Sequence, residues 1–146
     1  MNRKTIDGLL QEARARLERV EPEDALAAQR SGALLIDTRS NDERARAGVI
    51  PGALHIPRSV LEWRLCPKSD KDYRNPNVRG LDQWIILFCQ GGYSTSLAAA
   101  TLQEFGFRRA TDMCGGFTAW KRLGLPVHPA PDVAEESVPG MGLPDP

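Results

Sequence analysis

The sequence has few of the residues that build metal sites and disulfide frameworks. Its 146 residues include only two histidines and three cysteines, Cys66, Cys89 and Cys114. An odd number of widely spaced cysteines is a poor disulfide framework, so we expect free thiols in a reducing compartment. No two cysteines are spaced as Cys-x-x-Cys, and two histidines leave a structural zinc site without an obvious ligand set. We therefore expect no metal and no cofactor.

An excess of one charge and a long apolar run are also missing. Nineteen lysines and arginines balance nineteen aspartates and glutamates, so the formal net charge is +0. Nothing global favours nucleic acid or an anionic membrane as a partner. No apolar run approaches the roughly 20 residues that a membrane helix needs. The charged start, Asn2-Arg3-Lys4, lacks the apolar segment of a signal peptide, and the expected location is the cytoplasm.

The composition that is present predicts one globular domain with short additions at both ends. Hydrophobic residues make up 41% and charged residues 26%, which is ordinary for a domain that buries its own core. In residues 1–20, apolar positions recur at helical spacing, which predicts an amphipathic helix packed on the domain with its arginines on a solvated face. We assign the main domain to residues 21–128. Residues 129–146 are rich in proline and predict an extended or disordered tail.

Strand-like and helix-like segments alternate along the main domain. Apolar runs at 33–36, 54–56, 84–88 and 110–113 predict strands, and helical patterns separate them. Alternation of this kind is typical of an α/β fold with a mainly parallel central sheet flanked by helices. The run at 84–88 is continuous and apolar, which predicts a central strand covered on both faces. The polar stretch 66–82 predicts a long surface loop.

One cysteine stands in a setting that favours chemistry. Cys89 follows the strongest predicted strand and precedes two glycines and a helix, in the run Cys89-Gln90-Gly91-Gly92-Tyr93-Ser94-Thr95. Ligands of open α/β sheets bind beyond the carboxyl ends of the strands. A helix start offers free amide hydrogens and a positive dipole end, and the glycines let the loop curl into an anion nest. These features lower a cysteine pKa from about 8.5 by one to several units. We therefore predict a nucleophilic thiolate at Cys89 rather than a buried, inert thiol.

The other residues of this loop have two open interpretations each. Gln90 and Tyr93 either shape the pocket mouth or are merely exposed loop residues. Ser94 and Thr95 either bind an oxyanion held in the nest or cap the helix, which is the commoner use of such residues. Outside this loop, Cys66 begins the polar stretch 66–82, and it either serves as a second thiol or does nothing.

Several residues away from the loop have a structural interpretation. Asp37 and Arg39 are expected to pair with loop backbone or with charges such as Glu43. His55, on an apolar strand, is expected to be a packed residue and not a base. Cys114 is expected to be buried.

The cysteine loop resembles the active-site loop of rhodanese-like sulfurtransferases, and three further passages agree in family order. Asp37-Thr38-Arg39 looks like the family's Asp-x-Arg, and Gly48-Val49-Ile50-Pro51-Gly52-Ala53 looks like its Gly-His-Ile-Pro-Gly-Ala passage. Gly115-Gly116-Phe117-Thr118-Ala119-Trp120 looks like its C-terminal signature. The resemblance implies a three-layer rhodanese-like domain in which a cysteine cycles through a persulfide.

The chain departs from the family pattern at two positions. Ser94 stands where the family loop usually carries an arginine, and Val49 stands where it has a histidine. The family arginine helps to hold an anionic donor such as thiosulfate, so its loss weakens thiosulfate binding or leaves that task to another cation. Arg58, which follows Ile56-Pro57, is the candidate pocket cation. A nest of backbone amides needs no side chain and can still stabilise a thiolate or persulfide.

The predicted function is transfer of sulfane sulfur through a Cys89 persulfide. The donor is thiosulfate or a low-molecular-weight persulfide, and the acceptor is a thiol or cyanide, with a protein acceptor as a further option. One alternative is a catalytically weak binding or sulfur-carrier module, which the loss of the arginine suggests. Another is a phosphatase or arsenate reductase. The short loop and the missing arginine argue against it, because phosphoryl transfer depends on neutralising charge.

Overall fold

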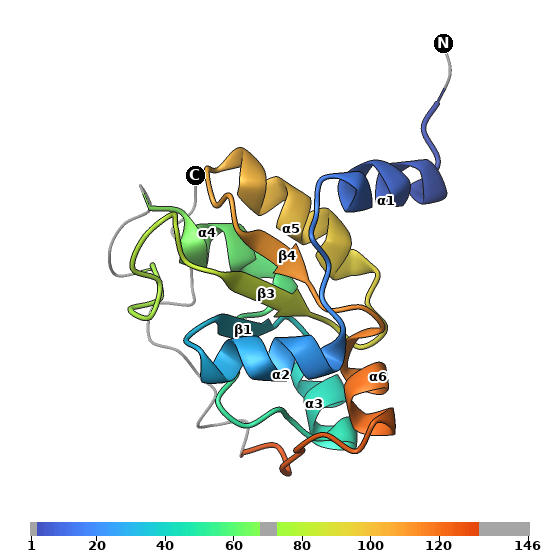
Figure 1. Cartoon of the computed structure of the whole chain (residues 1–146), viewed down its shortest axis with the longest axis vertical. Coiled ribbons are helices and arrows are strands. Elements are labelled where there is room, and N and C mark those ends of the chain that lie inside the picture. The colour runs from blue at the N-terminus through green and yellow to red at the C-terminus, as the bar shows by residue number, and fades with distance from the viewer. Residues whose placement is uncertain (1–2, 68–72, 132–146) are drawn as a thin grey trace.

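Helices and strands alternate along the chain as the sequence predicts (Figure 1). The computed structural model describes residues 3–67 and 73–131. Residues 68–72 of the predicted loop and 132–146 of the predicted tail lie outside the described residues. The helices are α1 (Ile6–Ala15), α2 (Pro22–Arg30), α3 (Asn41–Ala47), the 3-10 helix η1 (Arg58–Val60), α4 (Leu61–Leu65), α5 (Ser94–Glu104) and α6 (Gly116–Arg122). The strands are β1 (Leu34–Asp37), β2 (Leu54–His55), β3 (Ile85–Phe88) and β4 (Ala110–Asp112).

The four strands form one parallel sheet in the order β2-β1-β3-β4. The expected central strand is confirmed, because β3 lies between β1 and β4 and all four of its residues are buried. Asp37 is in register with Phe88, and Leu87 is in register with Asp112. The residues at the carboxyl ends of β1, β3 and β4 therefore gather at one edge of the sheet.

The sheet lies between two layers of helices, which confirms the predicted three-layer α/β fold (Figure 1). Alternate residues of β3 face opposite layers, as the pleat of a strand requires. Ile85 and Leu87 belong to a core shared with α4 and α5. Ile86 and Phe88 belong to a second core, shared with α2 and α6, which contains the fully buried Trp120.

The helix before the main domain packs against α5 (Figure 1). Thr5 caps it by accepting a hydrogen bond from the Gly8 amide at 3.0 Å, and Ala13 is its buried residue. The chain then runs past the free edge of β4, where Val20 forms an isolated parallel bridge with Met113. Arg19 and Val20 are thereby brought to the end of the sheet at which β3 and β4 finish.

Candidate active site

Cys89 lies at the carboxyl edge of the sheet, directly after the central strand. Thr38, at the end of β1, holds the strand end by donating from its amide and its hydroxyl to the Phe88 carbonyl at 3.0 and 3.1 Å. Residues 89–93 then form the loop that leads into α5. The sulfur therefore stands where a buried strand, a tight loop and the N-terminus of an 11-residue helix meet.

The sulfur of Cys89 is surrounded by hydrogen-bond donors. The Gly92 amide donates to Sγ at 3.2 Å, and the Thr95 hydroxyl oxygen lies 3.4 Å from it. Burial alone raises the pKa of the Cys89 thiol. The hydroxyls of Thr95 and Ser94 and the amides of Thr95 and Gly92 outweigh burial and bring the pKa below its ordinary value. The loop and the start of α5 thus stabilise the thiolate without a positively charged side chain on the loop.

Contacts with the start of α6 hold the loop in this curled form. The amides of Phe117 and Thr118 donate to the carbonyls of Cys89 and Gln90 at 2.9 and 3.0 Å. Gly92 has a φ of 86°, and a Cβ atom there would lie 2.7 Å from the Gly115 amide nitrogen. A side chain at this position would push the loop off α6, because the backbones approach too closely.

The hydroxyl residues at the start of α5 do not cap the helix. Tyr93 is the N-cap residue, and it makes no side-chain capping bond. The N-cap interpretation of Ser94 and Thr95 is therefore wrong. Thr95 is fully buried, and its hydroxyl donates to the Asp112 carboxylate at 3.1 Å, while Ser94 is exposed.

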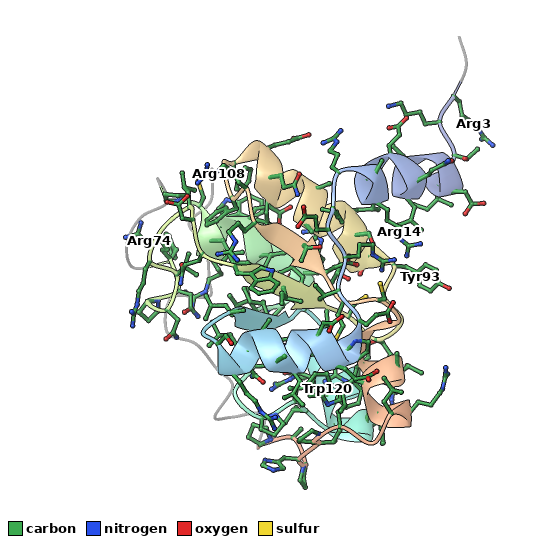
Figure 2. All side chains as sticks on the ribbon, viewed as in Figure 1. Arg3, Arg14, Arg74, Tyr93, Arg108 and Trp120 are labelled. Atoms are coloured by element: carbon green, nitrogen blue, oxygen red, sulfur yellow. The ribbon has the colours of Figure 1, made fainter. Side chains whose placement is uncertain are left out.

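Gln90 and Tyr93 lie differently on the loop. Gln90 is half-buried: its side-chain oxygen accepts from Arg39 at 3.1 Å and its amide donates to Thr118 at 3.2 Å. Tyr93 is 66% exposed, and its ring lies 5.7 Å from the guanidinium carbon of Arg14 (Figure 2). Gln90 is thus fixed by its neighbours, whereas Tyr93 stands at the surface beside the loop.

Asp37 and Arg39 form a buried pair that supports the loop from β1. The Arg39 guanidinium donates to both Asp37 carboxylate oxygens, at 3.0 and 2.8 Å, and to the Gly48 carbonyl at 2.8 Å. The expected pairing with loop backbone is therefore confirmed. The alternative partner, Glu43, is engaged elsewhere, because its carboxylate closes a capping box with Ser40 at the start of α3.

Arg58 lies near the carboxyl edge, but its guanidinium is engaged elsewhere. Its amide donates to the Thr38 carbonyl at 3.2 Å, which places its backbone at the end of β1. Its side chain is 39% exposed and pairs with Glu62 at 2.7 Å, one helical turn further on. A role for Arg58 as the pocket cation stays a prediction.

The remaining cysteines and His55 lie outside the loop. Cys114 is half-buried, so the expectation that it is buried is wrong, and burial is the main cause that raises its pKa. Cys66 is half-buried after α4, and its role as a second thiol stays a prediction. His55 lies 2.8 Å from the Arg39 carbonyl through Nε2 and 3.1 Å from Arg44 through Nδ1, which makes it part of the support of Arg39.

Two arginines that the sequence placed on a solvated face contact the cysteine loop instead. Arg14 of α1 donates to the Gly92 carbonyl at 2.9 Å and to the Ser96 hydroxyl at 3.1 Å. Arg19 donates to the same carbonyl at 3.1 Å and forms two hydrogen bonds with the Asp112 carboxylate. The expectation was wrong because α1 and the segment after it fold back over α5 and β4.

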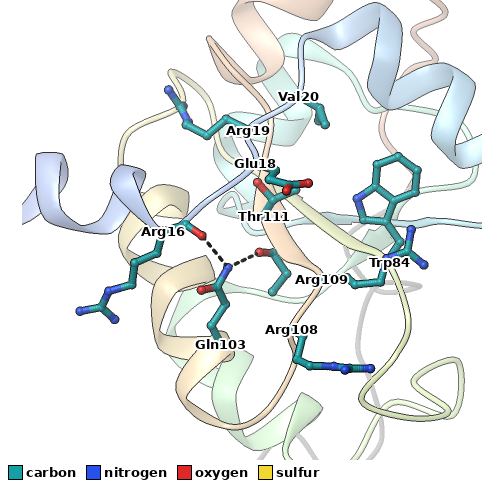
Figure 3. A pocket seen from close by; sticks show the side chains of 10 residues that line it. Arg16, Glu18, Arg19, Val20, Trp84, Gln103, Arg108, Arg109 and Thr111 are labelled. Atoms are coloured by element: carbon teal, nitrogen blue, oxygen red, sulfur yellow. Dashed lines mark hydrogen bonds between the residues drawn. The ribbon is translucent and has the colours of Figure 1, made fainter.

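A hollow of about 580 Å³ opens beside this segment, between residues 16–20 and β4 (Figure 3). Arg19 lines it together with residues of both walls, but no residue of the cysteine loop does. No group of three or more histidine, cysteine, aspartate or glutamate side chains that could hold a metal is found within residues 3–67 and 73–131. Within the same ranges, no helix has the length and apolarity needed to cross a membrane.

Comparison with known proteins places this geometry in a family. The Rhodanese-like domain family matches residues 21–123. A sulfurtransferase of Allochromatium vinosum is 33% identical over 96 residues, which cover 64% of this chain and 77% of the relative. The thiosulfate sulfurtransferase GlpE of Pseudomonas entomophila is 34% identical over 105 residues, covering 71% of this chain and 84% of its own. The human thiosulfate:glutathione sulfurtransferase is 34% identical over 91 residues, covering 60% and 78% of the two chains.

Solved structures share the fold of this chain. A protein of unknown function from Rhodopseudomonas palustris, described as a possible tyrosine phosphatase, superposes with a TM-score of 0.78 at 32% identity, covering 88% of this chain and 97% of its own. The human single-domain sulfurtransferase TSTD1 superposes with a TM-score of 0.61 at 30% identity, covering 71% and 95%. The chain therefore belongs to the rhodanese-like family and is a sulfurtransferase, with its rhodanese-like domain over residues 21–123.

Proposed function

We propose that Cys89 carries the transferred sulfur as a persulfide, taken from an anionic small-molecule donor and passed to a thiol. The observation that carries the proposal is the donor set around Sγ, in which the Gly92 amide at 3.2 Å and the Thr95 hydroxyl at 3.4 Å favour an ionised sulfur. A thiolate is the form of cysteine that attacks a sulfur electrophile.

Thiosulfate is the proposed donor, in line with the names of the GlpE and human relatives. The Cys89 thiolate attacks the outer sulfur of thiosulfate and forms a new S–S bond. The original S–S bond breaks, and its electron pair leaves with sulfite. The product is a persulfide anion on Cys89, which the same amides and hydroxyls stabilise because its charge stays within the loop.

A low-molecular-weight thiol is the proposed acceptor, as the name of the human relative suggests by analogy. The acceptor thiolate attacks the outer sulfur of the persulfide, the S–S bond to Cys89 breaks, and Cys89 leaves as a thiolate. Cyanide or a protein thiol can take the acceptor's place by the same displacement. Because all three cysteines are free thiols, we further propose that the protein works in the cytoplasm.

The loop suits sulfur transfer better than phosphoryl transfer. No residue between Cys89 and Thr95 is cationic, and Ser94 occupies the position of the family arginine. Arg14 and Arg19 reach the loop, but the loop atom to which both donate is the Gly92 carbonyl, whereas the Gly92 amide donates to the sulfur. A phosphoryl group needs several charge-neutralising donors, whereas a bound sulfur needs only the donors around Sγ.

Intact-mass measurement after incubation with thiosulfate tests the proposal. We expect a gain of one sulfur atom that a low-molecular-weight thiol then removes. Cys89→Ser should abolish the gain, and the matched variants Cys66→Ser and Cys114→Ser should retain it. A glutathione persulfide donor is tested in parallel, because the missing arginine affects anionic thiosulfate most. If neither donor adds sulfur to Cys89, the proposed function is wrong.

A further inference from the structure

The carboxylate of Asp112 lies behind the cysteine loop and is fully buried. It accepts two hydrogen bonds from Arg19, at 2.8 and 3.2 Å, one from Thr95 at 3.1 Å and one from Ser96 at 2.8 Å. Arg19 is its only cationic partner among the described ion pairs, and the Arg19 side chain is 18% exposed. A buried carboxylate is costly unless a partner of opposite charge and further donors satisfy it, and Asp112 has both.

Asp112 and the sulfur of Cys89 compete for one hydrogen atom. The Thr95 hydroxyl oxygen lies 3.1 Å from Asp112 Oδ2 and 3.4 Å from Sγ, but a hydroxyl has a single hydrogen to donate. While Cys89 is a thiol, its S–H can donate to Thr95, and Thr95 donates to Asp112. Once Cys89 is a thiolate or a persulfide anion, the sulfur needs that hydrogen, and Thr95 must turn away from Asp112.

Arg19 decides how strongly Asp112 holds this hydrogen. Paired with Arg19, the carboxylate is neutralised and keeps three hydrogen bonds after Thr95 turns away, two from Arg19 and one from Ser96. Without Arg19 it would hold the Thr95 hydrogen more strongly. Asp112 lies 3.1 Å and Sγ lies 3.4 Å from the Thr95 hydroxyl oxygen, so the two groups are within 6.5 Å of each other. The uncompensated negative charge of Asp112 would therefore destabilise the thiolate.

We propose that Arg19 is a positioning residue for sulfur transfer, which by pairing with Asp112 releases the Thr95 hydroxyl to the anionic sulfur on Cys89. This inference rests on the proposed role of Cys89. Arg19 lies before residue 21, where the family match begins, so the segment preceding the rhodanese-like domain takes part in its active site. Arg19 also donates to the Gly92 carbonyl at 3.1 Å and so braces the residue whose amide contacts the sulfur.

Other titratable and charged groups surround this network, and none of them is substituted in the variants below. Arg14 reaches Gly92 and Ser96 from α1, and Arg39 reaches Gln90 from the end of β1. Tyr93 lies on the loop itself. Glu21 and Cys114 interact electrostatically with Arg19. Because Cys114 also responds to Arg19, the titration of Cys89 must be followed separately from that of Cys114.

Arg19→Met is the first variant, because methionine fills part of the space of the arginine side chain. Arg19 also lines the hollow beside β4, and a smaller residue would enlarge this hollow (Figure 3). The readout is the rate of Cys89 alkylation against pH, with the modified peptide identified by mass so that Cys66 and Cys114 do not contribute. We expect the Cys89 pKa to rise by about one unit and alkylation at neutral pH to slow by up to about tenfold.

Arg16→Met is the matched control, because Arg16 comes from the same segment but pairs with Glu104 at the surface. It should leave the Cys89 titration unchanged. The double variant Arg19→Met/Asp112→Asn should return the Cys89 pKa to near its wild-type value. Without the carboxylate charge at position 112, no cation is needed to neutralise it. A general loosening of the loop would not be reversed by a second substitution.

Two outcomes overturn the inference: an Arg19→Met titration equal to wild type, or no recovery in the double variant. If Arg19→Met does not fold, the single variant Asp112→Asn tests the inference. It should lower the Cys89 pKa below the wild-type value, and a pKa equal to or above that of the wild type contradicts the inference. Alkylation requires no sulfur donor, so this test is separate from that of the proposed function. Wild-type protein that titrates as expected but gains no sulfur from thiosulfate or glutathione persulfide would refute the persulfide proposal instead.

Discussion

Replacing Thr95 with valine removes one oxygen atom beside the sulfur and little else. Thr95 is fully buried, and valine has nearly its shape, so the substitution opens no cavity. The Gly92 amide still donates to Sγ, and the backbone amide of residue 95 still acts to lower the pKa of Cys89. Asp112 loses one of its donors but keeps Arg19 and Ser96. The change therefore isolates the hydroxyl that lies 3.4 Å from the sulfur.

The expected effect follows from the competition between Asp112 and Cys89. A hydrogen bond to a charged group contributes about 1.5–3 kcal/mol. Thr95 must leave the Asp112 carboxylate to bind the thiolate, so the net contribution lies at or below the lower end of that range. About 1.4 kcal/mol corresponds to one pKa unit. We therefore expect Thr95→Val to raise the pKa of Cys89 by about one unit.

Alkylation of Cys89 across a range of pH is the assay. The midpoint of the rate profile should move to higher pH, while the rate at the alkaline plateau stays unchanged, because the thiolate is exposed to the reagent as before. Thr101→Val is the matched control, since Thr101 lies on the same helix and its hydroxyl bonds the Leu97 carbonyl at 3.1 Å. A midpoint in Thr95→Val that equals the wild-type midpoint would refute the reasoning.

Three further predictions concern the same loop. Gly92→Ala should destabilise the fold by about 1–2 kcal/mol or more in urea unfolding, because φ is 86° and the new Cβ meets Gly115. Gly32→Ala is the control, because Gly32 has a φ of 106° and open space around it, so that this variant should show only the cost of the backbone conformation. An equal loss of stability in both variants would mean that the contact of the new Cβ with Gly115 contributes nothing. Ser94→Arg should lower KM for thiosulfate several-fold, with less effect on the KM for glutathione persulfide, since position 94 is exposed and can accept a guanidinium. An equal change in KM for both donors would contradict a role in binding the thiosulfate oxygens. Because the folded state lowers the pKa of Cys89, its thiolate should stabilise the protein at alkaline pH, and this contribution should be lost as pH falls through the folded pKa. Urea unfolding of wild type and Cys89→Ser between pH 6 and about 9.5 measures this contribution. If the difference in unfolding free energy between the two proteins stays constant with pH, the Cys89 pKa is not lowered in the folded state.

Most of the fold could be predicted because its signals are local. The apolar run 84–88 is long enough to require burial on both faces, and β3 is indeed the central strand. Pro22 marks the first residue of α2, since its ring suits the first turn of a helix. Gly91 and Gly92 after a strand predict a tight turn into a helix. Each of these inferences needs only neighbouring residues, which a sequence places side by side.

The parts of the site that sequence could not provide depend on contacts between distant segments. Asp112 stands 17 positions after Thr95, and Arg19 stands 93 positions before Asp112. Asp112 lies in a short strand with a weak pattern, and nothing in its neighbours marks it as an ion-pair partner. Only the parallel register, with Leu87 beside Asp112, brings it to the edge of the sheet where Cys89 stands.

Arg14 differs from Arg19, because a local signal for it was present in the sequence. Leu10, Ala13, Arg14 and Leu17 are spaced i, i+3, i+4 and i+7, which puts Arg14 on the apolar stripe of α1 and not on its solvated face. A cation in such a stripe needs a polar partner on the surface that the helix covers. Its partners are the Gly92 carbonyl and the Ser96 hydroxyl. The position of Arg14 around the helix, rather than its residue type, is therefore the signal that predicts a partner on the covered surface.

The positions of Arg14 and Arg19 determine how the absence of the family arginine affects the binding of the sulfur donor. A guanidinium at position 94 would belong to the loop itself and could follow a bound oxyanion. Arg14 and Arg19 instead donate to a loop carbonyl and to Asp112, so their charge braces the backbone whose Gly92 amide faces the sulfur. Such a site stabilises charge on sulfur more than charge on the distant oxygens of thiosulfate. Compared with a loop that carries an arginine at position 94, this site should therefore be less active with thiosulfate, and the difference should be smaller with a persulfide donor. The activities of wild type and Ser94→Arg with both donors measure that difference. If wild type prefers thiosulfate and Ser94→Arg leaves this preference unchanged, the reasoning is contradicted.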